Sequence, residues 1–315
     1  MKRLRIRTWQ ADALLLAVTA VWGATFPVVK NATDLLHGGV PTYWFLAARF
    51  TLATVLVGLF FWRRVKAAPL RTWAAGALIG CFLFAGYAFQ TFGIAHTTSA
   101  RAGFITGLSV VLVPALTVIW LRRKPSPGAW LGVLTATAGL ALLSLNADLM
   151  PTYGDFLVFL CAIAFALQII AISRFAGQHD PVALAVIQIG VAAVLSWGMH
   201  LREAGTVGPG VAGVLWWSGP ASVTAAWLIC GVLATAVAFL LQNVLQPHTT
   251  PTHTALIFAA EPVWGAIFSF LLLGETLPLR GYVGGAMILA GMLLAELPLW
   301  GARPDADAVA GQPGD

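Results

Sequence analysis

Residues 90–98 read QTFGIAHTT and residues 242–250 read QNVLQPHTT, so a glutamine followed six positions later by His-Thr-Thr occurs twice. The same offset of 152 residues aligns further identical pairs, which are Ile105 with Ile257, Gly132 with Gly284, and Gly139 with Gly291. A second offset, of 143 residues, aligns Asp12 with Asp155 and Trp22 with Phe165. These matches predict a chain built from two related halves.

The composition excludes a soluble globular protein. Hydrophobic residues make up 59% of the 315 residues and charged residues 10%, against about 25% charged residues in a typical soluble domain. A transmembrane helix needs about 20 apolar residues, and the chain contains ten such stretches, which are too long and continuous for transmembrane β-strands. The predicted spans are 11–30, 42–62, 72–92, 98–121, 127–146, 154–173, 181–200, 223–245, 251–273 and 279–300.

Five spans fall in each half, and this odd number reverses the orientation of the second half in the membrane. We therefore expect an all-α integral membrane protein with ten transmembrane helices arranged as two inverted five-helix repeats. The expected repeats are residues 1–147 and 148–300, followed by a disordered cytoplasmic tail at 301–315. Inverted repeats are typical of secondary transporters, which bind their substrate near the membrane midplane between the repeats.

Basic residues cluster in alternate loops, which sets the predicted orientation. The clusters are Lys2, Arg3, Arg5 and Arg7 before the first span, Arg63, Arg64, Lys66 and Arg71 after the second, and Arg122, Arg123 and Lys124 after the fourth. Loops rich in Lys and Arg stay on the cytoplasmic side, so both termini are predicted to be cytoplasmic. Because the net charge of +6 is spread over these loops, we expect no nucleic-acid partner.

Several short segments together resemble one family of transporters. They are AVWGATFP at 20–27, LAARF at 46–50, AAEPVW at 259–264, LGET at 273–276 and GGAMILAG at 284–291. Their order and spacing resemble the EamA-type branch of the drug/metabolite transporter superfamily over residues 11–300. The resemblance implies a central cavity, alternating access, and export of amino acids, other metabolites or drugs across a bacterial inner membrane. Pro27 departs from the family pattern, where an ordinary apolar residue is expected.

Aromatic and polar side chains share helix faces at matching positions of the two halves. Residues three apart lie on one face of a helix, and four spans each carry an aromatic residue with a hydroxyl or amide at this distance. The pairs are Trp22 with Thr25, Tyr87 with Gln90, Phe165 with Gln168, and Phe239 with Gln242. Aromatic walls with a few hydrogen-bonding groups are typical of small-molecule sites, so these eight residues are candidates for the substrate cavity. The alternative is that they pack and bond between helices.

Arg49 lies well inside the second span. Its guanidinium keeps its charge and needs a carboxylate, carbonyl groups or water. Arg49 therefore either binds a substrate carboxylate or serves as a structural cation near helix-end carbonyls. Gln188, close to the equivalent position of the seventh span, is its uncharged counterpart and joins the candidate cavity.

Glu261 is the only carboxylate deep within a predicted span. A buried carboxylate can load and release a proton, which makes Glu261 a candidate for proton coupling. Pro262 interrupts helical hydrogen bonding directly after it, and we favour a structural role for Glu261 at this break. Asp12 and Asp155 begin the first and sixth spans and are predicted to cap these helices.

Other function classes lack their motifs in this sequence. It contains no His-Glu-x-x-His and no phosphate-binding loop ending in Lys-Ser/Thr, so we expect neither an enzyme nor a nucleotide-driven pump, and no metal or cofactor. A flippase of a lipid-linked substrate and, less favoured, a membrane enzyme that modifies lipid stay as alternatives. The expected partners are a small-molecule substrate and the lipid bilayer, and the sequence is compatible with protons and with a homodimer.

Overall fold

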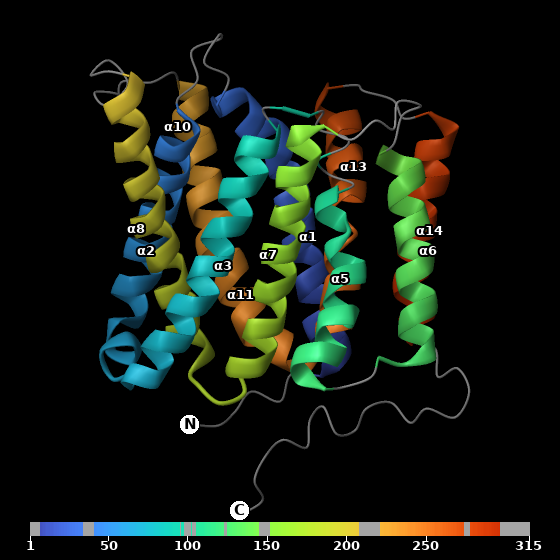
Figure 1. Ribbon diagram of the computed structural model, residues 1–315, viewed down its shortest axis with the longest axis horizontal. Helices are drawn as coiled ribbons and strands as arrows, with labels where there is room; N and C mark the ends of the chain where they lie inside the picture. Colours follow the sequence, from blue (N-terminus) through green and yellow to red (C-terminus); the bar gives the residue numbers. More distant parts are fainter. Residues whose placement is uncertain are drawn as a thin grey trace, which may run out of the picture.

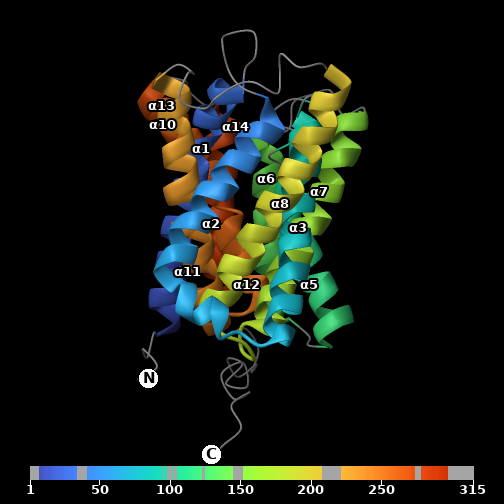
Figure 2. The same cartoon turned by 90° about the vertical axis from the view of Figure 1, so that its left-hand side faces the viewer.

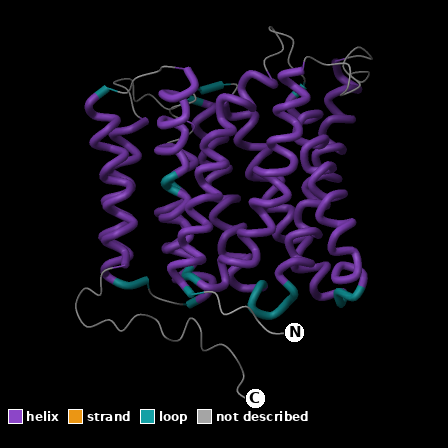
Figure 3. Tube along the Cα trace, turned by 180° about the vertical axis from the view of Figure 1, so that it is seen from behind, coloured by secondary structure: helices purple, strands orange, loops and turns teal. Residues whose placement is uncertain are grey.

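Helices occupy every predicted span. The computed structural model describes residues 7–33, 41–94, 96–97, 102, 105–122, 125–144, 152–207, 221–273 and 278–296, and every regular element in these ranges is a helix. The helices stand side by side as a bundle (Figure 1). The described loops lie near its two ends, apart from a short turn inside the bundle (Figure 3). The predicted all-helical class is thus confirmed for the described residues, and the predicted tail at 301–315 lies outside them.

The helices follow the predicted order. In the first half they are α1 (Thr8–Thr33), α2 (Thr42–Lys66), α3 (Leu70–Ile94), α5 (Ser109–Leu116), η2 (Thr117–Leu121) and α6 (Pro127–Ser144). In the second half they are α7 (Tyr153–Phe175), α8 (Pro181–Val207), α10 (Ala221–Leu228), η4 (Ile229–Val237), α11 (Ala238–Leu245), η5 (Gln246–His248), α12 (Pro251–Phe258), α13 (Glu261–Leu273) and α14 (Leu279–Glu296).

Five helices of the described chain are long and apolar enough to cross a membrane. They are Thr42–Lys66, Leu70–Gly93, Tyr153–Phe175, Pro181–Arg202 and Ala221–His248. Shorter apolar helices lie at Ile105–Leu121, Pro127–Leu142 and Leu279–Ala295. Large apolar side chains are exposed on the bundle, such as Phe60 at 84% and Leu293 at 71%, as expected where lipid rather than water covers the surface.

Three predicted spans are interrupted. The eighth passes from α10 through the π-helical segment η4 into α11. A turn at 259–260 divides the ninth, and α13 begins after it at Glu261. A turn residue also precedes α5, which begins at Ser109, the position equivalent to Glu261 at the offset of 152 residues. Hydropathy does not reveal the interruptions of the fourth and eighth spans, because apolar residues continue through them. The break in the ninth span lies directly before Glu261 and Pro262, where the sequence predicted one.

The two predicted carboxylate caps have different outcomes. Asp155 is the third residue of α7 and forms a capping box with Thr152, so this prediction is confirmed. The prediction for Asp12 is wrong, because α1 already begins at Thr8. Asp12 Oδ2 instead lies 3.5 Å from His253 Nε2, and the two side chains form an ion pair when the imidazole is protonated.

Glycines bring α6 and α14 into backbone contact. A Cβ atom on Gly132 would lie 2.5 Å from the carbonyl oxygen of Gly291, and one on Gly139 would lie 2.6 Å from that of Gly284. The offset of 152 residues aligns Gly132 with Gly284 and Gly139 with Gly291. Gly132 therefore contacts the sequence counterpart of Gly139, and Gly139 contacts the sequence counterpart of Gly132. The two helices stand together at one edge of the bundle (Figure 1).

The remaining helices form the part of the bundle that holds the candidate site. Helix α8 packs against both α2 and α3, and α3 packs against α7, so these four lie side by side in Figure 2. Helix α1 contacts α13 and the continuous segment formed by α10, η4 and α11. The candidate residues lie on α1, α2, α3, α7, α8 and α11, and therefore on the helices that pack together here.

Candidate functional site

Four aromatic rings from four helices meet inside the bundle and form what we call the ring cluster: Trp22, Tyr87, Phe165 and Phe239. The ring centroids of Tyr87 and Phe165 are 5.5 Å apart, and those of Trp22 and Phe239 are also 5.5 Å apart. A distance of 6.5 Å between Tyr87 and Phe239 joins the two pairs. The four rings predicted from helical spacing are thus brought together. The equivalent ring pairs of the two halves have the same centroid distance, but one pair is tilted at 45° and the other is edge to face at 86°.

Two further rings extend the cluster and were missed from the sequence. Phe50 meets Tyr87 at 5.3 Å, and Phe258 meets Trp22 at 5.1 Å, both edge to face, which is a favourable geometry for aromatic pairs. Phe50 directly follows Arg49, so its position next to a candidate was the signal that could have found it. Phe258 ends α12 before the turn, and nothing in the local sequence distinguishes it.

Arg49 lies against the ring cluster. It is 3% exposed, and its Nε donates a hydrogen bond of 3.0 Å to Thr235 Oγ1. Its guanidinium carbon lies 5.2 Å from the ring centre of Tyr87 and 5.6 Å from that of Phe50, within cation–π distance. Two ion pairs of the described residues lie elsewhere, between Arg64 and Asp180 and between Asp12 and His253.

The π-helical segment η4 supports both Arg49 and the ring cluster. Thr235, which accepts the bond from Arg49, donates its own hydroxyl to the carbonyl of Cys230 at 2.7 Å. The indole Nε1 of Trp22 donates to the carbonyl of Ala234 at 2.9 Å. Short π-helical stretches inside α-helices are often found at functional sites, and this one positions a cation and an aromatic ring.

The glutamines gather next to the ring cluster. Gln168 Nε2 donates to Gln188 at 3.4 Å and to Gln242 at 3.3 Å, and Gln242 Nε2 donates to Gln246 at 3.2 Å. All four side chains are buried. We call these four residues the glutamine cluster. The Nε2 group of Gln188 has no hydrogen-bond partner among the described residues, so the cluster contains one unsatisfied buried donor.

Gln246 was missed from the sequence. It follows Gln242 by four positions, a spacing that places both side chains on one helix face, and this was the available signal. Its amide also donates to the carbonyl of Ile169 and to Ser173 Oγ. These bonds extend the glutamine cluster to α7 near the end of α11.

Two candidates bond away from the ring cluster. Gln90 Nε2 approaches Thr106 Oγ1 at 3.5 Å, and that hydroxyl is 3.9 Å from Cys161 Sγ. Gln90 and Gln242 are equivalent in sequence, but they are in different surroundings. Thr25 is buried and donates its hydroxyl to the carbonyl of Trp22 on its own helix at 2.7 Å.

Glu261 begins α13 and is half-buried. A carboxylate in the first turn of a helix is favoured by the helix dipole, and a proline directly after the start, such as Pro262, is well tolerated. The backbone of Glu261 also touches α1, because a Cβ on Gly23 would lie 2.7 Å from its carbonyl oxygen. This position suits the structural role that the sequence favoured, and proton coupling stays a prediction.

Two polar contacts join the two halves near the starts of α7 and α1. Thr97, which follows α3, donates its hydroxyl to Asp155 Oδ1 at 2.6 Å. Asp12, the equivalent of Asp155, pairs with His253 at the start of α12. Asp155 in the second half thus binds the segment after the third span of the first half. Asp12 in the first half binds the segment after the equivalent span of the second half, at residues 223–245. We call these two interactions the end contacts.

Comparisons with known proteins identify the family. The EamA-like transporter family matches residues 9–145 and again residues 152–297. An uncharacterized transporter of Archaeoglobus fulgidus is 32% identical over 292 residues, which cover 93% of this chain and 87% of that protein. A probable terminal-alkyne amino-acid exporter of Streptantibioticus cattleyicolor is 23% identical over 300 residues, covering 93% of this chain and 95% of that protein.

A crystal structure shares the fold at low sequence identity. The two chains are 20% identical, with a TM-score of 0.74 over 92% of this chain and 97% of the other. Together with the relatives named transporters and the membrane-length helices, these matches describe a multi-pass membrane protein that works in transport. The chain therefore belongs to the EamA-like transporter family.

Proposed function

We propose that this protein is a secondary-active exporter of amino acids or related small metabolites and drugs, and that it works by alternating access. The observation that carries the proposal is a buried guanidinium, Arg49, placed against a cluster of aromatic rings inside a bundle of apolar helices. A relative is named as a probable amino-acid exporter, which supports the substrate class.

The proposed binding site combines three chemistries that suit an amphipathic zwitterion. Arg49 would bind the carboxylate, since a guanidinium forms paired hydrogen bonds with a carboxylate. The ring cluster would hold the apolar part of the substrate and can also attract its ammonium group. The unpartnered Nε2 of Gln188 offers a further donor, because a buried donor without a partner is costly unless a ligand supplies an acceptor.

We infer that the two halves, residues 1–147 and 148–300, are inverted repeats with ten membrane spans. The crosswise glycine contacts between α6 and α14 support this inference, since two equivalent elements related by a twofold axis exchange equivalent contacts. The matching ring distances in the ring cluster support it as well. The Lys and Arg clusters favour cytoplasmic termini in a bacterial inner membrane.

The end contacts supply the proposed gates. In the predicted orientation the Asp12–His253 pair closes the cytoplasmic end and the Thr97–Asp155 bond closes the outer end. Alternating access requires that the two ends open in turn around a central site. Export would therefore break the first contact to load substrate and the second to release it.

Proton coupling through Glu261 is a separate part of the proposal. If Glu261 carries the proton, Glu261→Gln should abolish uptake driven by a pH gradient and spare exchange of substrate for substrate, because an amide mimics only the protonated form. If Glu261 only supports the start of α13, the variant should lose folded protein or both activities together. A well-folded variant with a selective loss of pH-driven uptake would decide for coupling.

The decisive experiment is uptake into proteoliposomes with a panel of amino acids and cationic drugs, with and without a pH gradient. Wild-type protein should transport at least one zwitterionic compound, Arg49→Ala should lose this transport, and Arg49→Lys should retain part of it because the charge remains. Arg202→Ala, an exposed change away from the site, is the control. Equal transport by wild type and Arg49→Ala would show that the guanidinium does not bind the substrate. Lipid movement without solute transport would favour the flippase alternative.

Topology is tested independently. Reporter fusions near residues 66 and 124 should be cytoplasmic, and fusions near 148 and 210 should be external. If positions 124 and 148 report the same side, the ten-span inverted arrangement is wrong.

A further inference from the structure

A cavity of about 310 Å³ lies away from the ring cluster, where α2 ends and α3 and α8 begin. The side chains of Arg63, Arg64, Thr72 and Asp180 line it, together with the short connection between α2 and α3. This is the end of α2 where the sequence places its second basic cluster. The cavity therefore carries two guanidinium groups and one carboxylate at an edge of the bundle.

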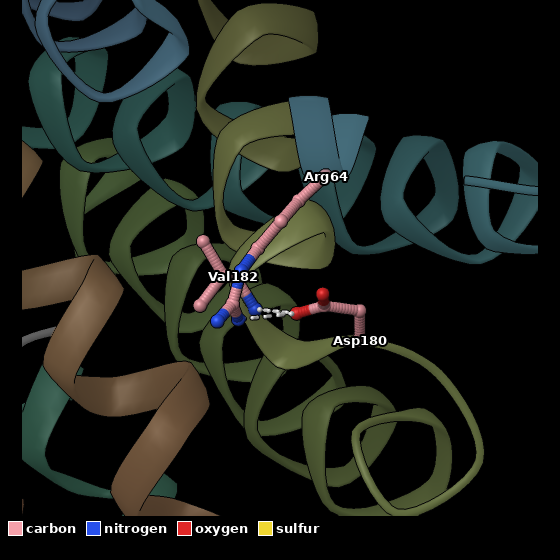
Figure 4. Close-up of polar contacts among 3 residues, drawn as sticks. All are labelled: Arg64, Asp180 and Val182. Carbon is pink, nitrogen blue, oxygen red and sulfur yellow. Dashed lines mark hydrogen bonds and ion pairs between the residues drawn. The ribbon is translucent and has the colours of Figure 1, made fainter. Parts of the chain in front are cut away.

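The carboxylate does not neutralise both arginines. Arg64 Nη1 and Asp180 Oδ1 are 3.5 Å apart, and the two side chains are 36% and 38% exposed, so the pair is weak. The same Asp180 oxygen accepts the backbone N–H of Val182 at 2.9 Å and so caps α8. Figure 4 shows the Arg64 guanidinium and Val182 converging on this carboxylate. A guanidinium has five N–H donors, so Arg64 keeps donors for a further anion.

Arg63 adds a second cation beside aromatic surface. Its guanidinium carbon lies 5.6 Å from the ring centre of Trp62. Neighbouring apolar side chains are turned outward, with Phe60 exposed to 84%, Leu70 to 84% and Trp62 to 52%. Tryptophan at the end of a membrane helix is typical of the lipid–water interface. Acyl chains can cover this apolar surface directly beside the basic cavity.

We propose that this cavity binds the phosphate headgroup of an anionic phospholipid, with Arg63 and Arg64 contacting the phosphate and the acyl chains lying along the exposed faces of α2 and α3. Arginine binds phosphate oxygens through paired hydrogen bonds, and basic pockets between membrane helices favour anionic headgroups. A free phosphate ion would use the same arginines but would gain nothing from the apolar surface beside them, so the structure favours lipid. The site does not depend on the identity of the transported substrate.

The test uses the full-length protein in a neutral detergent, titrated with phosphatidylglycerol, with phosphatidylcholine of the same acyl chains, and with sodium phosphate. Native mass spectrometry reads out the bound lipid. Wild-type protein should bind phosphatidylglycerol in preference to the other two. The double variant Arg63→Ala/Arg64→Ala should bind it on the order of thirtyfold more weakly, since each basic residue at an anionic lipid surface contributes roughly fivefold in affinity. Arg174→Ala, an exposed change outside the cavity lining, is the matched control and should bind like wild type.

A change at Asp180 separates lipid binding from a purely structural role. Asparagine caps helices as well as aspartate does, so Asp180→Asn keeps the cap of α8 and removes the carboxylate that competes with the phosphate. Its affinity for phosphatidylglycerol should rise severalfold, and this result stays informative even if the double arginine variant fails to fold. Unchanged binding in both variants would overturn the proposal. Competition by sodium phosphate at equal affinity would overturn the assignment to lipid and leave a site for a soluble anion.

Discussion

The glycine contact between α6 and α14 allows the inverted arrangement to be tested by adding one methyl group. In Gly139→Ala the new Cβ would lie 2.6 Å from the carbonyl oxygen of Gly284 and 2.9 Å from the backbone nitrogen of Ile288. Both neighbours are backbone atoms that no rotamer change can move. The helices would therefore have to separate by most of an ångström, and overpacking of this kind costs about 1–3 kcal/mol of unfolding free energy.

Thermal unfolding of the purified protein in detergent measures this cost. We expect the apparent Tm of Gly139→Ala to lie roughly 2–6 °C below that of a matched control in which alanine brings the same gain in helix propensity. The matched control is Gly285→Ala on α14, where the closest atom to the new Cβ is Val263 Cγ1 at 3.7 Å, an ordinary contact. Alanine is better than glycine inside a helix by about 1 kcal/mol, so the control should keep or raise the Tm.

Two results would refute this reasoning. A Tm of Gly139→Ala equal to that of Gly285→Ala, with no loss in either variant, would mean that the backbones of α6 and α14 do not approach each other at this position. The crosswise contact would then no longer support the inverted repeats. An equal loss in both variants would mean that this helix pair tolerates no added methyl group wherever it points, and the distances would have no predictive value.

The ring cluster, the glutamine cluster and the end contact between Thr97 and Asp155 give three further predictions. Tyr87→Ala and Phe239→Ala should each weaken apparent substrate affinity in proteoliposome uptake about tenfold with little change in Tm, whereas a large loss of Tm with unchanged affinity would assign both rings to packing. Gln188→Leu removes an unpartnered buried donor but also the Oε1 acceptor of the 3.4 Å bond from Gln168, so Tm should change little while substrate affinity falls, and unaltered uptake would separate this amide from the substrate. Thr97→Val keeps the side-chain shape but loses the bond to Asp155. Since a hydrogen bond to a carboxylate contributes about 1.5 kcal/mol or more, substrate exchange should accelerate by about tenfold, and an unchanged rate would exclude this contact from the transport cycle.

Much of the candidate site could be predicted from helical spacing and the internal repeat. The aromatic residues of the four predicted pairs meet in the ring cluster, because residues three apart share a face and the repeat selects equivalent faces. The same rule failed for Gln90, which bonds toward Thr106 rather than the glutamine cluster. Spacing identifies a shared face on one helix but not the helix that lies opposite.

The sequence by itself determined the all-helical class and the order and approximate limits of the described helices, and it predicts the relation between the two halves. These properties depend on long apolar runs and on aligned residues, both of which are local features of the chain. The tertiary structure alone decided that Asp12 pairs with His253 instead of capping α1, and that a π-helical turn holds Arg49 through Thr235. Such contacts join residues far apart in the chain, and their formation depends on how closely whole helices can pack, which no local pattern specifies.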